Sequence, residues 1–183
     1  MGDVDGDGRE DLVIGAPAAT VGDADRVGVV YLVLNPLEGE MDLSDADAII
    51  VGHEALDFLG YAAANLGDMD NDGLSDFAVG APGIDLFRGI EQGHVPDSPG
   101  ATHMFFQVPP DGDVIEVSDF ALKGTSNPGM TGAALSAGDL DADGNQDLVV
   151  GEREHSTQGL LSGAAYVYYG PITRELIPEG DGA

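Results

Sequence analysis

The sequence predicts an all-β fold of β-propeller blades, each with four antiparallel strands, with about three blades in an open or incomplete ring. Three observations support this prediction. An acidic, glycine-containing loop occurs three times, beginning at Asp3, Asp68 and Asp139. Short apolar runs follow each loop at similar distances. No segment shows the hydrophobic period of a helix, and four short strands per repeat are typical of a propeller blade.

The apolar runs are rich in Val and Ile and are bounded by Gly or Pro, as expected of buried strands. Directly after the acidic loops, we expect strands at 11–15, 76–80 and 147–151. Further along each repeat, the next apolar runs predict strands at 28–33, 100–106 and 163–169. Weaker apolar runs predict a last strand at 48–51 and at 120–123.

The repeat spacing predicts one propeller-type domain over residues 1–183. We expect an incomplete first blade at 1–56, a second blade at 57–128 and an incomplete third blade at 129–183. Met1 lies two residues before the first loop, so we expect the chain to begin inside a repeat. Propellers typically have 4–8 blades, so three cannot readily close a ring. The open sheet edges then favour pairing with another copy, or the chain is a piece of a longer propeller.

Each acidic loop has aspartates at its positions 1, 3, 5 and 9 and a glycine at position 6. Side chains at positions 1, 3 and 5 can converge on one point, and a carbonyl at position 7 adds a neutral oxygen. Calcium accepts about 6–8 oxygen ligands, whereas magnesium demands tighter octahedral geometry. A solvated acidic turn is the alternative, and three copies disfavour it. The predicted ligands of three Ca²⁺ ions are Asp3, Asp5, Asp7, Arg9 and Asp11; Asp68, Asp70, Asp72, Leu74 and Asp76; and Asp139, Asp141, Asp143, Asn145 and Asp147.

Two other classes of calcium-binding repeat do not fit the loops. An EF-hand needs an acidic residue at position 12 and flanking helices. Position 12 is occupied by Ile14, Val79 and Val150, each inside a predicted strand. The tandem glycine-rich nonapeptides of a calcium-binding β-roll are also missing.

The composition limits the partners and the compartment. The formal net charge is −28, with 34 acidic residues against six basic ones, so we expect no nucleic-acid partner. Six positive charges from three calcium ions would leave −22. No apolar stretch reaches the roughly 20 residues of a membrane span, so no direct membrane insertion is expected. The chain has no cysteine, which excludes disulfides and thiolate metal sites and fits either redox compartment.

The combined motif resembles the FG-GAP repeats of integrin α-subunit β-propellers. The resemblance rests on the acidic loops, on the endings Gly15-Ala-Pro17 and Gly80-Ala-Pro82, and on an FG-like dipeptide before the loop. Leu59-Gly60 and Thr131-Gly132 stand in place of Phe-Gly, and the third repeat ends in Gly151-Glu-Arg153. The resemblance implies that the calcium loop joins the first and second strands of a blade. By that pattern, the opening blade lacks its first strand.

The resemblance also implies a function. Integrin propellers bind their partner on the face opposite the calcium loops. In this chain, that face is formed by the connections 18–27, 83–99 and 152–162, and the longest of them carries Arg88 and His94. We expect an extracellular or cell-surface module that binds a protein ligand or adhesion partner, with calcium in a structural role. Two alternatives stay open: an accessory propeller of a larger secreted enzyme, and a purely structural calcium-binding repeat.

The chain itself is not expected to be an enzyme. Its four histidines, His53, His94, His103 and His155, share no metal-ligand spacing. The sequence has no Gly-x-Ser-x-Gly elbow and no cysteine nucleophile. His103 lies in a predicted strand, so we expect it to be packed in the core.

Overall fold

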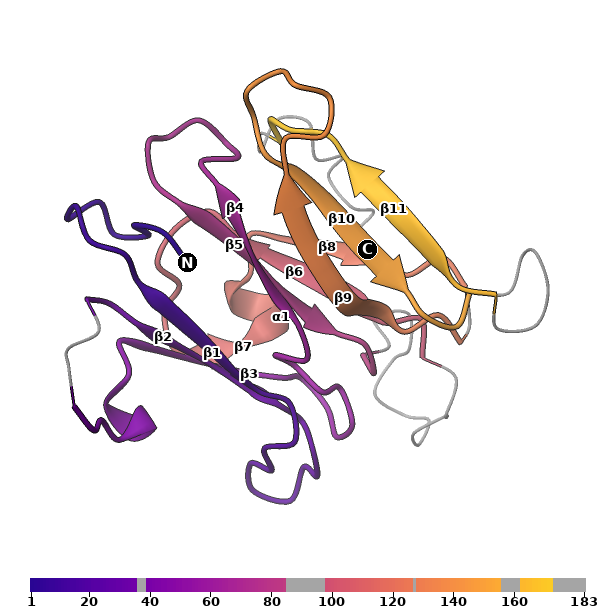
Figure 1. Ribbon diagram of the computed structural model, residues 1–183. Helices are drawn as coiled ribbons and strands as arrows, with labels where there is room; N and C mark the ends of the chain where they lie inside the picture. Colours follow the sequence, from indigo (N-terminus) through magenta and orange to yellow (C-terminus); the bar gives the residue numbers. More distant parts are fainter. Residues whose placement is uncertain (36–38, 85–97, 127, 156–161, 173–183) are drawn as a thin grey trace.

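Three β-sheets lie side by side in the computed structural model, with the second between the other two (Figure 1). The structure describes residues 1–35, 39–84, 98–126, 128–155 and 162–172. Within these residues the sheets do not close into a ring, and no helix is long and apolar enough to span a bilayer. The predicted all-β fold of incomplete propeller type is therefore confirmed.

Sheet 1 has the strand order β1-β2-β3-β7. Its strands are β1 (Leu12–Ala16), β2 (Val29–Val33), β3 (Ala48–Val51) and β7 (Gly112–Asp113). The outer edge of β1 is paired only by the isolated bridge between Gly2 and Asp11. That the opening blade is incomplete stays a prediction. The parallel pairing of β7 with β3 was not predicted, because it joins segments about 60 residues apart.

Sheet 2 is a complete four-stranded blade with the order β4-β5-β6-β8, all antiparallel. Its strands are β4 (Ala63–Gly67), β5 (Asp76–Ala81), β6 (Ala101–Phe105) and β8 (Phe120–Lys123). Every residue of β5 and β6 is buried, because these central strands are covered on both faces. The acidic loop joins β4 to β5, as the resemblance implies.

Sheet 3 has three strands among the described residues, in the order β11-β10-β9. They are β9 (Thr131–Gly138), β10 (Asp147–Glu152) and β11 (Ala164–Tyr168). The division of the chain at residues 56 and 128 stays a prediction.

Two short helical turns interrupt the all-β pattern. They are the 3₁₀ turn η1 (Leu43–Asp45) and the helix α1 (Val114–Val117). Each follows an aspartate, Asp42 or Asp113, whose side chain accepts a hydrogen bond from the backbone N–H two residues later. One helical turn is too short to produce a hydrophobic period, which is why the sequence did not reveal either.

Two apolar cores hold the sheets together. The first lies between sheets 1 and 2, where Phe77 and Phe105 stack with ring centroids 4.8 Å apart. Val30 and Ile50 of sheet 1 belong to the same core. The second lies between sheets 2 and 3 and includes Ala78, Met104, Leu122, Leu148 and Val150. Successive sheets thus bury one face of each blade against the next.

Glycine pairs bring the backbones of successive sheets into direct contact. A Cβ atom on Gly15 would lie 2.1 Å from the carbonyl oxygen of Gly60, and one on Gly80 would lie 2.0 Å from that of Gly132. Gly60 and Gly132 both have a φ of 85°, which favours glycine. The glycines of the Gly-Ala-Pro and FG-like motifs therefore meet across each junction between sheets.

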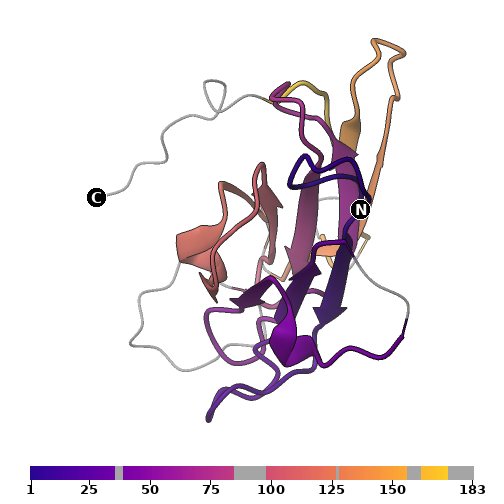
Figure 2. The same ribbon diagram turned by 90° about the vertical axis from the view of Figure 1, so that its left-hand side faces the viewer.

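Each acidic loop lies at the same end of its sheet: the first is at the left in Figure 1, and the β4–β5 and β9–β10 loops are at the top. Figure 2 shows the same grouping from the side, with the β9–β10 loop beside the β4–β5 loop. The β1–β2 connection lies at the opposite end of the sheets. The antiparallel topology thus places the β1–β2 connection opposite the acidic loops, whereas the β2–β3 connection returns to the acidic end, where the N–H of Asn35 donates to Asp11.

Candidate metal centres

Each acidic loop gathers three carboxylates into a small volume. In every repeat these are the aspartates at positions 1, 3 and 9, whose nearest oxygen atoms lie within 4.8 Å of one another. The three groups are Asp3, Asp5 and Asp11; Asp68, Asp70 and Asp76; and Asp139, Asp141 and Asp147. The structure thus brings together nine of the twelve predicted side-chain ligands.

Position 9 lies at or directly before the start of the strand that follows each loop, and its carboxylate connects the loop to the sheet. Asp11, Asp76 and Asp147 are all buried. Their Oδ2 atoms accept hydrogen bonds from the backbone N–H at position 2, at 2.7, 2.6 and 2.7 Å. In the first loop, Asp11 Oδ1 also accepts the N–H of Asn35, at 2.9 Å. Each loop is thereby closed into a ring.

Position 1 organises the turn at the glycine. Asp3, Asp68 and Asp139 accept the backbone N–H of the position 6 glycines Gly8, Gly73 and Gly144, at 2.9 to 3.0 Å. All three glycines have φ between 91° and 96°, a left-handed conformation that a residue with a Cβ rarely adopts. The glycine predicted from the motif is therefore required by the backbone.

The position 5 aspartates lie outside the three carboxylate groups. In each loop, the Oδ1 atom of this residue accepts the backbone N–H of position 7, at 2.9, 2.8 and 2.7 Å. The residues are Asp7, Asp72 and Asp143. Their role as ligands stays a prediction, as do the carbonyl ligands at Arg9, Leu74 and Asn145.

Asp76 shows most clearly that the loop chemistry fits a cation. Its Oδ1 atom is fully buried and has no hydrogen-bond partner, although Asp76 is 0% exposed. Burial, with the charges of Asp70 and Asp72, raises the pKa of Asp76 to about 7, although hydrogen bonds from Met69 and Asp70 oppose the rise. A buried, unpaired carboxylate oxygen is costly, and a hard cation would satisfy it. The donor set of all-oxygen ligands therefore fits calcium.

The exposed carboxylates of the loops also affect one another. The N–H of Asp7 lowers the pKa of Asp5, but burial and the neighbouring charges of Asp7, Asp11 and Asp3 outweigh it and raise the pKa. In the third loop, hydrogen bonds from the backbone and side chain of Asn145 lower the pKa of Asp143. Repulsion from the neighbouring carboxylates thus acts on Asp5, and a bound cation would relieve that repulsion.

Neighbouring acidic loops are linked to each other. The N–H of Ser75, at position 8 of the second loop, donates to the carbonyl oxygen of Asp3 in the first loop, at 2.8 Å. In the next pair of loops, Gln146 occupies the position of Ser75, and its Cγ atom would lie 3.0 Å from a Cβ on Gly67. The loops therefore form a continuous row.

The predicted partner-binding connections are described only in part. Arg88 and His94 lie outside the described residues. His103 lies in β6 and is 0% exposed, so it is packed as expected, and burial lowers its pKa to about 4.

One buried polar cluster was missed at the sequence level. Glu152, in the altered Gly-Glu-Arg ending, is 0% exposed and accepts the Oγ–H of Ser126 at 2.6 Å. Its other oxygen lies 2.9 Å from His155 Nδ1. Burial alone would raise the pKa of Glu152, but hydrogen bonds from Ser126, Tyr166 and His155 outweigh it and lower the pKa. The departure from Gly-Ala-Pro was the available signal, but Ser126 and Tyr166 are distant from Glu152 in sequence, and only His155 lies near it.

The comparisons with known proteins agree with the repeat pattern. Residues 1–33 match the family model of the FG-GAP repeat. Integrin alpha-PS2 of Drosophila melanogaster is 37% identical over 162 residues, which cover 81% of this chain and 11% of the integrin. Integrin alpha-IIb of Mus musculus is 35% identical over 167 residues, which cover 81% of this chain and 14% of the integrin.

A second group of relatives consists of phospholipases and not of integrins. The phosphatidylinositol-glycan-specific phospholipase D of Rattus norvegicus is 29% identical over 184 residues, which cover 91% of this chain and 19% of the phospholipase. The chain therefore spans less than a fifth of the length of each of these curated relatives. The repeated loops, the blade topology and these likenesses together show that the chain is an integrin-α-like FG-GAP repeat propeller chain.

Proposed function

We propose that the chain binds three calcium ions, one in each acidic loop, and that the ions stabilise the blades without taking part in chemistry. The carboxylates at positions 1, 3, 5 and 9 and the carbonyl at position 7 would hold each ion. The observation that carries this proposal is the threefold convergence of carboxylates, with the unpaired buried oxygen of Asp76 in the second loop. Calcium supplies only charge neutralisation and a rigid set of oxygen contacts here.

A structural role follows from where the loops are attached. The position 9 carboxylates are buried directly before β1 and at the starts of β5 and β10, so each ion would join its loop to the strand that follows. Binding to the folded state alone stabilises it by about 2.7 kcal/mol per site when free calcium is a hundredfold above Kd. The predicted ligand carboxylates would all be engaged by the ions, so we also propose that the chain has no catalytic activity of its own.

Calorimetric titration of the metal-free chain with calcium tests this proposal. We expect three sites per chain, and two sites in the double variant Asp139→Asn with Asp141→Asn. Asp23→Asn is the matched control, since Asp23 is an exposed acid outside the loops. A chelator should lower the melting temperature of the wild type. A folded chain that takes up no calcium, or equal stoichiometry in the double variant and the control, would exclude the proposal.

We further propose that the chain acts as an extracellular or cell-surface scaffold for a protein ligand or adhesion partner. The integrin relatives support this role, and the opposite end of the sheets is available for the partner. Labelling of intact cells with a membrane-impermeant biotin reagent tests the location. Recovery of the native protein only after lysis, with none in the medium, would contradict it.

The phospholipase relatives favour a second candidate, an accessory propeller within a larger secreted enzyme. The complete gene distinguishes the two. A catalytic domain encoded in the same reading frame would support the accessory role, and an adhesion-type architecture would support the first.

A further inference from the structure

The first and second acidic loops contact each other through a residue that stands between two predicted calcium ligands. Ser75 occupies position 8 of the second loop, between the predicted carbonyl ligand Leu74 and the buried carboxylate of Asp76. The backbone N–H of Ser75 donates to the carbonyl oxygen of Asp3 in the first loop, at 2.8 Å. Groups that would hold the ion of the second loop therefore flank the residue that holds the start of the first loop.

Close packing surrounds this hydrogen bond. A Cβ atom on Gly2 would lie 2.7 Å from the Cβ atom of Ser75, and a Cβ atom on Gly6 would lie 2.8 Å from Cδ2 of Leu74. Val4, between the two glycines, is 0% exposed and belongs to the core between sheets 1 and 2. The first half of the first loop thus rests directly on the second loop.

Asp3 is also the residue that organises the first loop. Its Oδ1 atom accepts the N–H groups of Gly6 and Asp7, at 2.7 and 3.0 Å, and its Oδ2 atom accepts the N–H of Gly8 at 2.9 Å. The same carboxylate is one of the three that converge in this loop. A shift of the Asp3 backbone would therefore move a predicted ligand and the turn at the glycine together.

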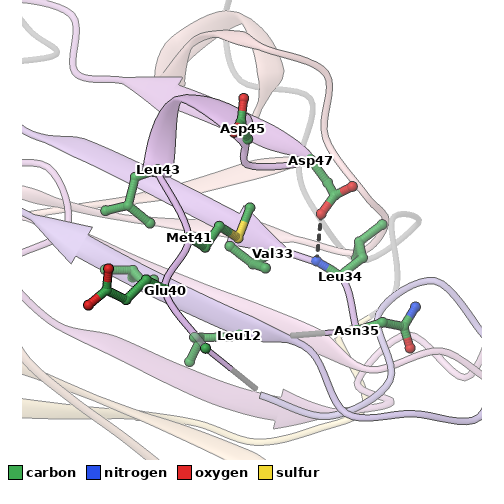
Figure 3. A pocket seen from close by; sticks show the side chains of 11 residues that line it. Leu12, Val33, Leu34, Asn35, Glu40, Met41, Leu43, Asp45 and Asp47 are labelled. Carbon is green, nitrogen blue, oxygen red and sulfur yellow. Dashed lines mark hydrogen bonds between the residues drawn. The ribbon is translucent and has the colours of Figure 1, made fainter. Parts of the chain in front are cut away.

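The other end of the first loop is held by its own sheet. The N–H of Asn35 donates to Oδ1 of Asp11, at 2.9 Å. The chain before Asn35 is fixed in turn, since the N–H of Leu34 donates to Oδ2 of Asp47 at 2.8 Å (Figure 3). Sheet 1 thus positions the predicted ligand Asp11, whereas the second loop positions the predicted ligand Asp3.

The second and third loops lack the corresponding hydrogen bond. Gln146 occupies the position of Ser75 and its side chain lies beside Gly67, but its N–H donates to no described residue of the second loop. Asn145, at position 7 of the third loop, donates from Nδ2 to Asp143 of its own loop, at 3.0 Å. The first pair of neighbouring loops is therefore linked more closely than the second pair.

We propose that calcium binding to the first loop and calcium binding to the second loop strengthen each other through the hydrogen bond from Ser75 to Asp3. The inference rests on the proposed calcium sites and adds how two of them are coupled. The second loop carries independent evidence for an ion, the unpaired buried oxygen of Asp76. Leu74 and Asp76 would be immobilised as ligands, so the N–H of Ser75 between them would be fixed as well. Coupling is reciprocal, so each loop should raise the affinity of the other by the same factor.

A calcium titration followed by NMR of the isotope-labelled chain tests the proposal, because one glycine amide in each loop donates to the position 1 carboxylate. These reporters are Gly8, Gly73 and Gly144. In the second-loop variant Asp68→Asn with Asp70→Asn, the Kd of the first loop should rise at least about fivefold. The third-loop variant Asp139→Asn with Asp141→Asn is the matched control, and it should change the Kd of the first loop by less than about twofold.

Two further comparisons identify the route of the coupling. The first-loop variant Asp3→Asn with Asp5→Asn should raise the Kd of the second loop by the same factor as in the reverse experiment. Ser75→Pro removes the N–H and should abolish the coupling, whereas Ser75→Ala keeps the N–H and should preserve it. Gln146→Pro is the matched control at the same position of the third loop. If Ser75→Pro does not fold, the comparison of the loop variants decides, since it leaves Ser75 unchanged.

The possible failures are distinguishable. A wild type that binds calcium, with the same Kd of the first loop in the second-loop and third-loop variants, would overturn the coupling and leave the proposed calcium sites standing. Coupling that persists in Ser75→Pro would overturn the role of the hydrogen bond. A folded wild type that binds no calcium would refute the calcium sites themselves and the coupling with them.

Discussion

Replacing Gly80 with alanine should disrupt the junction between sheets 2 and 3. A Cβ atom at this position would lie 2.0 Å from the carbonyl oxygen of Gly132, 2.8 Å from its carbonyl carbon and 3.1 Å from its Cα. All three atoms belong to the backbone of the neighbouring sheet, so no side-chain rotation can relieve the overlap. The strands β5 and β9 would have to move apart and open the apolar core that contains Leu148 and Val150.

The expected cost lies at the upper end of what overpacking produces, about 3 kcal/mol. For a chain of this length, a loss of that size lowers the melting temperature by about 6–12 °C. Urea denaturation followed by circular dichroism, with calcium held constant, gives the free energy of unfolding. Gly138→Ala is the matched control, because no atom lies within 4 Å of a Cβ there and its φ is not positive.

Two results would refute this reasoning. If Gly80→Ala unfolded within about 0.5 kcal/mol of the wild type, backbone contact would not hold the sheets together. If Gly138→Ala were equally damaging, the loss would reflect glycine replacement in general.

Three other predictions concern buried ionisable groups. Burial raises the pKa of Asp57 to about 6. Its contribution to stability is therefore present at about pH 4, and about 3 kcal/mol of the free energy of unfolding is lost as the pH rises through 6. Urea denaturation at several pH values should show that Asp57→Asn removes this loss. The low pKa of His103, about 4, has the opposite effect, because the free energy of unfolding falls as the pH drops from about 6.5 to 4. In His103→Gln, the free energy of unfolding should fall less over this pH range. Glu152→Gln should lower the free energy of unfolding at neutral pH by about 1–3 kcal/mol, measured by thermal or urea unfolding. The exposed control Glu116→Gln should leave the free energy of unfolding unchanged. Equal losses in the two variants would contradict a role for the Glu152 hydrogen bonds.

Much of the fold could be predicted because the same local pattern occurs three times. The strands that follow the loops lie where the Val-rich and Ile-rich runs place them, in β1, β5 and β10. The EF-hand was correctly rejected, since Ile14, Val79 and Val150 lie in these strands. A repeat that buries its apolar face against its neighbours leaves a regular signal in the sequence.

The contacts that could not be predicted join residues far apart in the chain. The pairing of β7 with β3 depends on how sheet 2 is placed against sheet 1. Ser126 and Tyr166, two of the partners of Glu152, come from separate segments, and only His155 lies near Glu152 in sequence. At the acidic loops, the sequence indicated that the aspartates at positions 1, 3 and 9 converge, but only coordinates could show that one oxygen of Asp76 lacks a partner.

The hydrogen bond from the backbone N–H of Ser75 to the carbonyl oxygen of Asp3 means that residues other than the aspartates would also affect the proposed ion binding. Ser75 carries no charge and occupies a variable position of its own loop, yet its backbone holds the first residue of the adjacent loop. A mutational scan restricted to aspartates would pass over it. The acidic loops at this end of the molecule therefore act as one connected row, in which a neutral residue of one repeat contacts the loop of its neighbour.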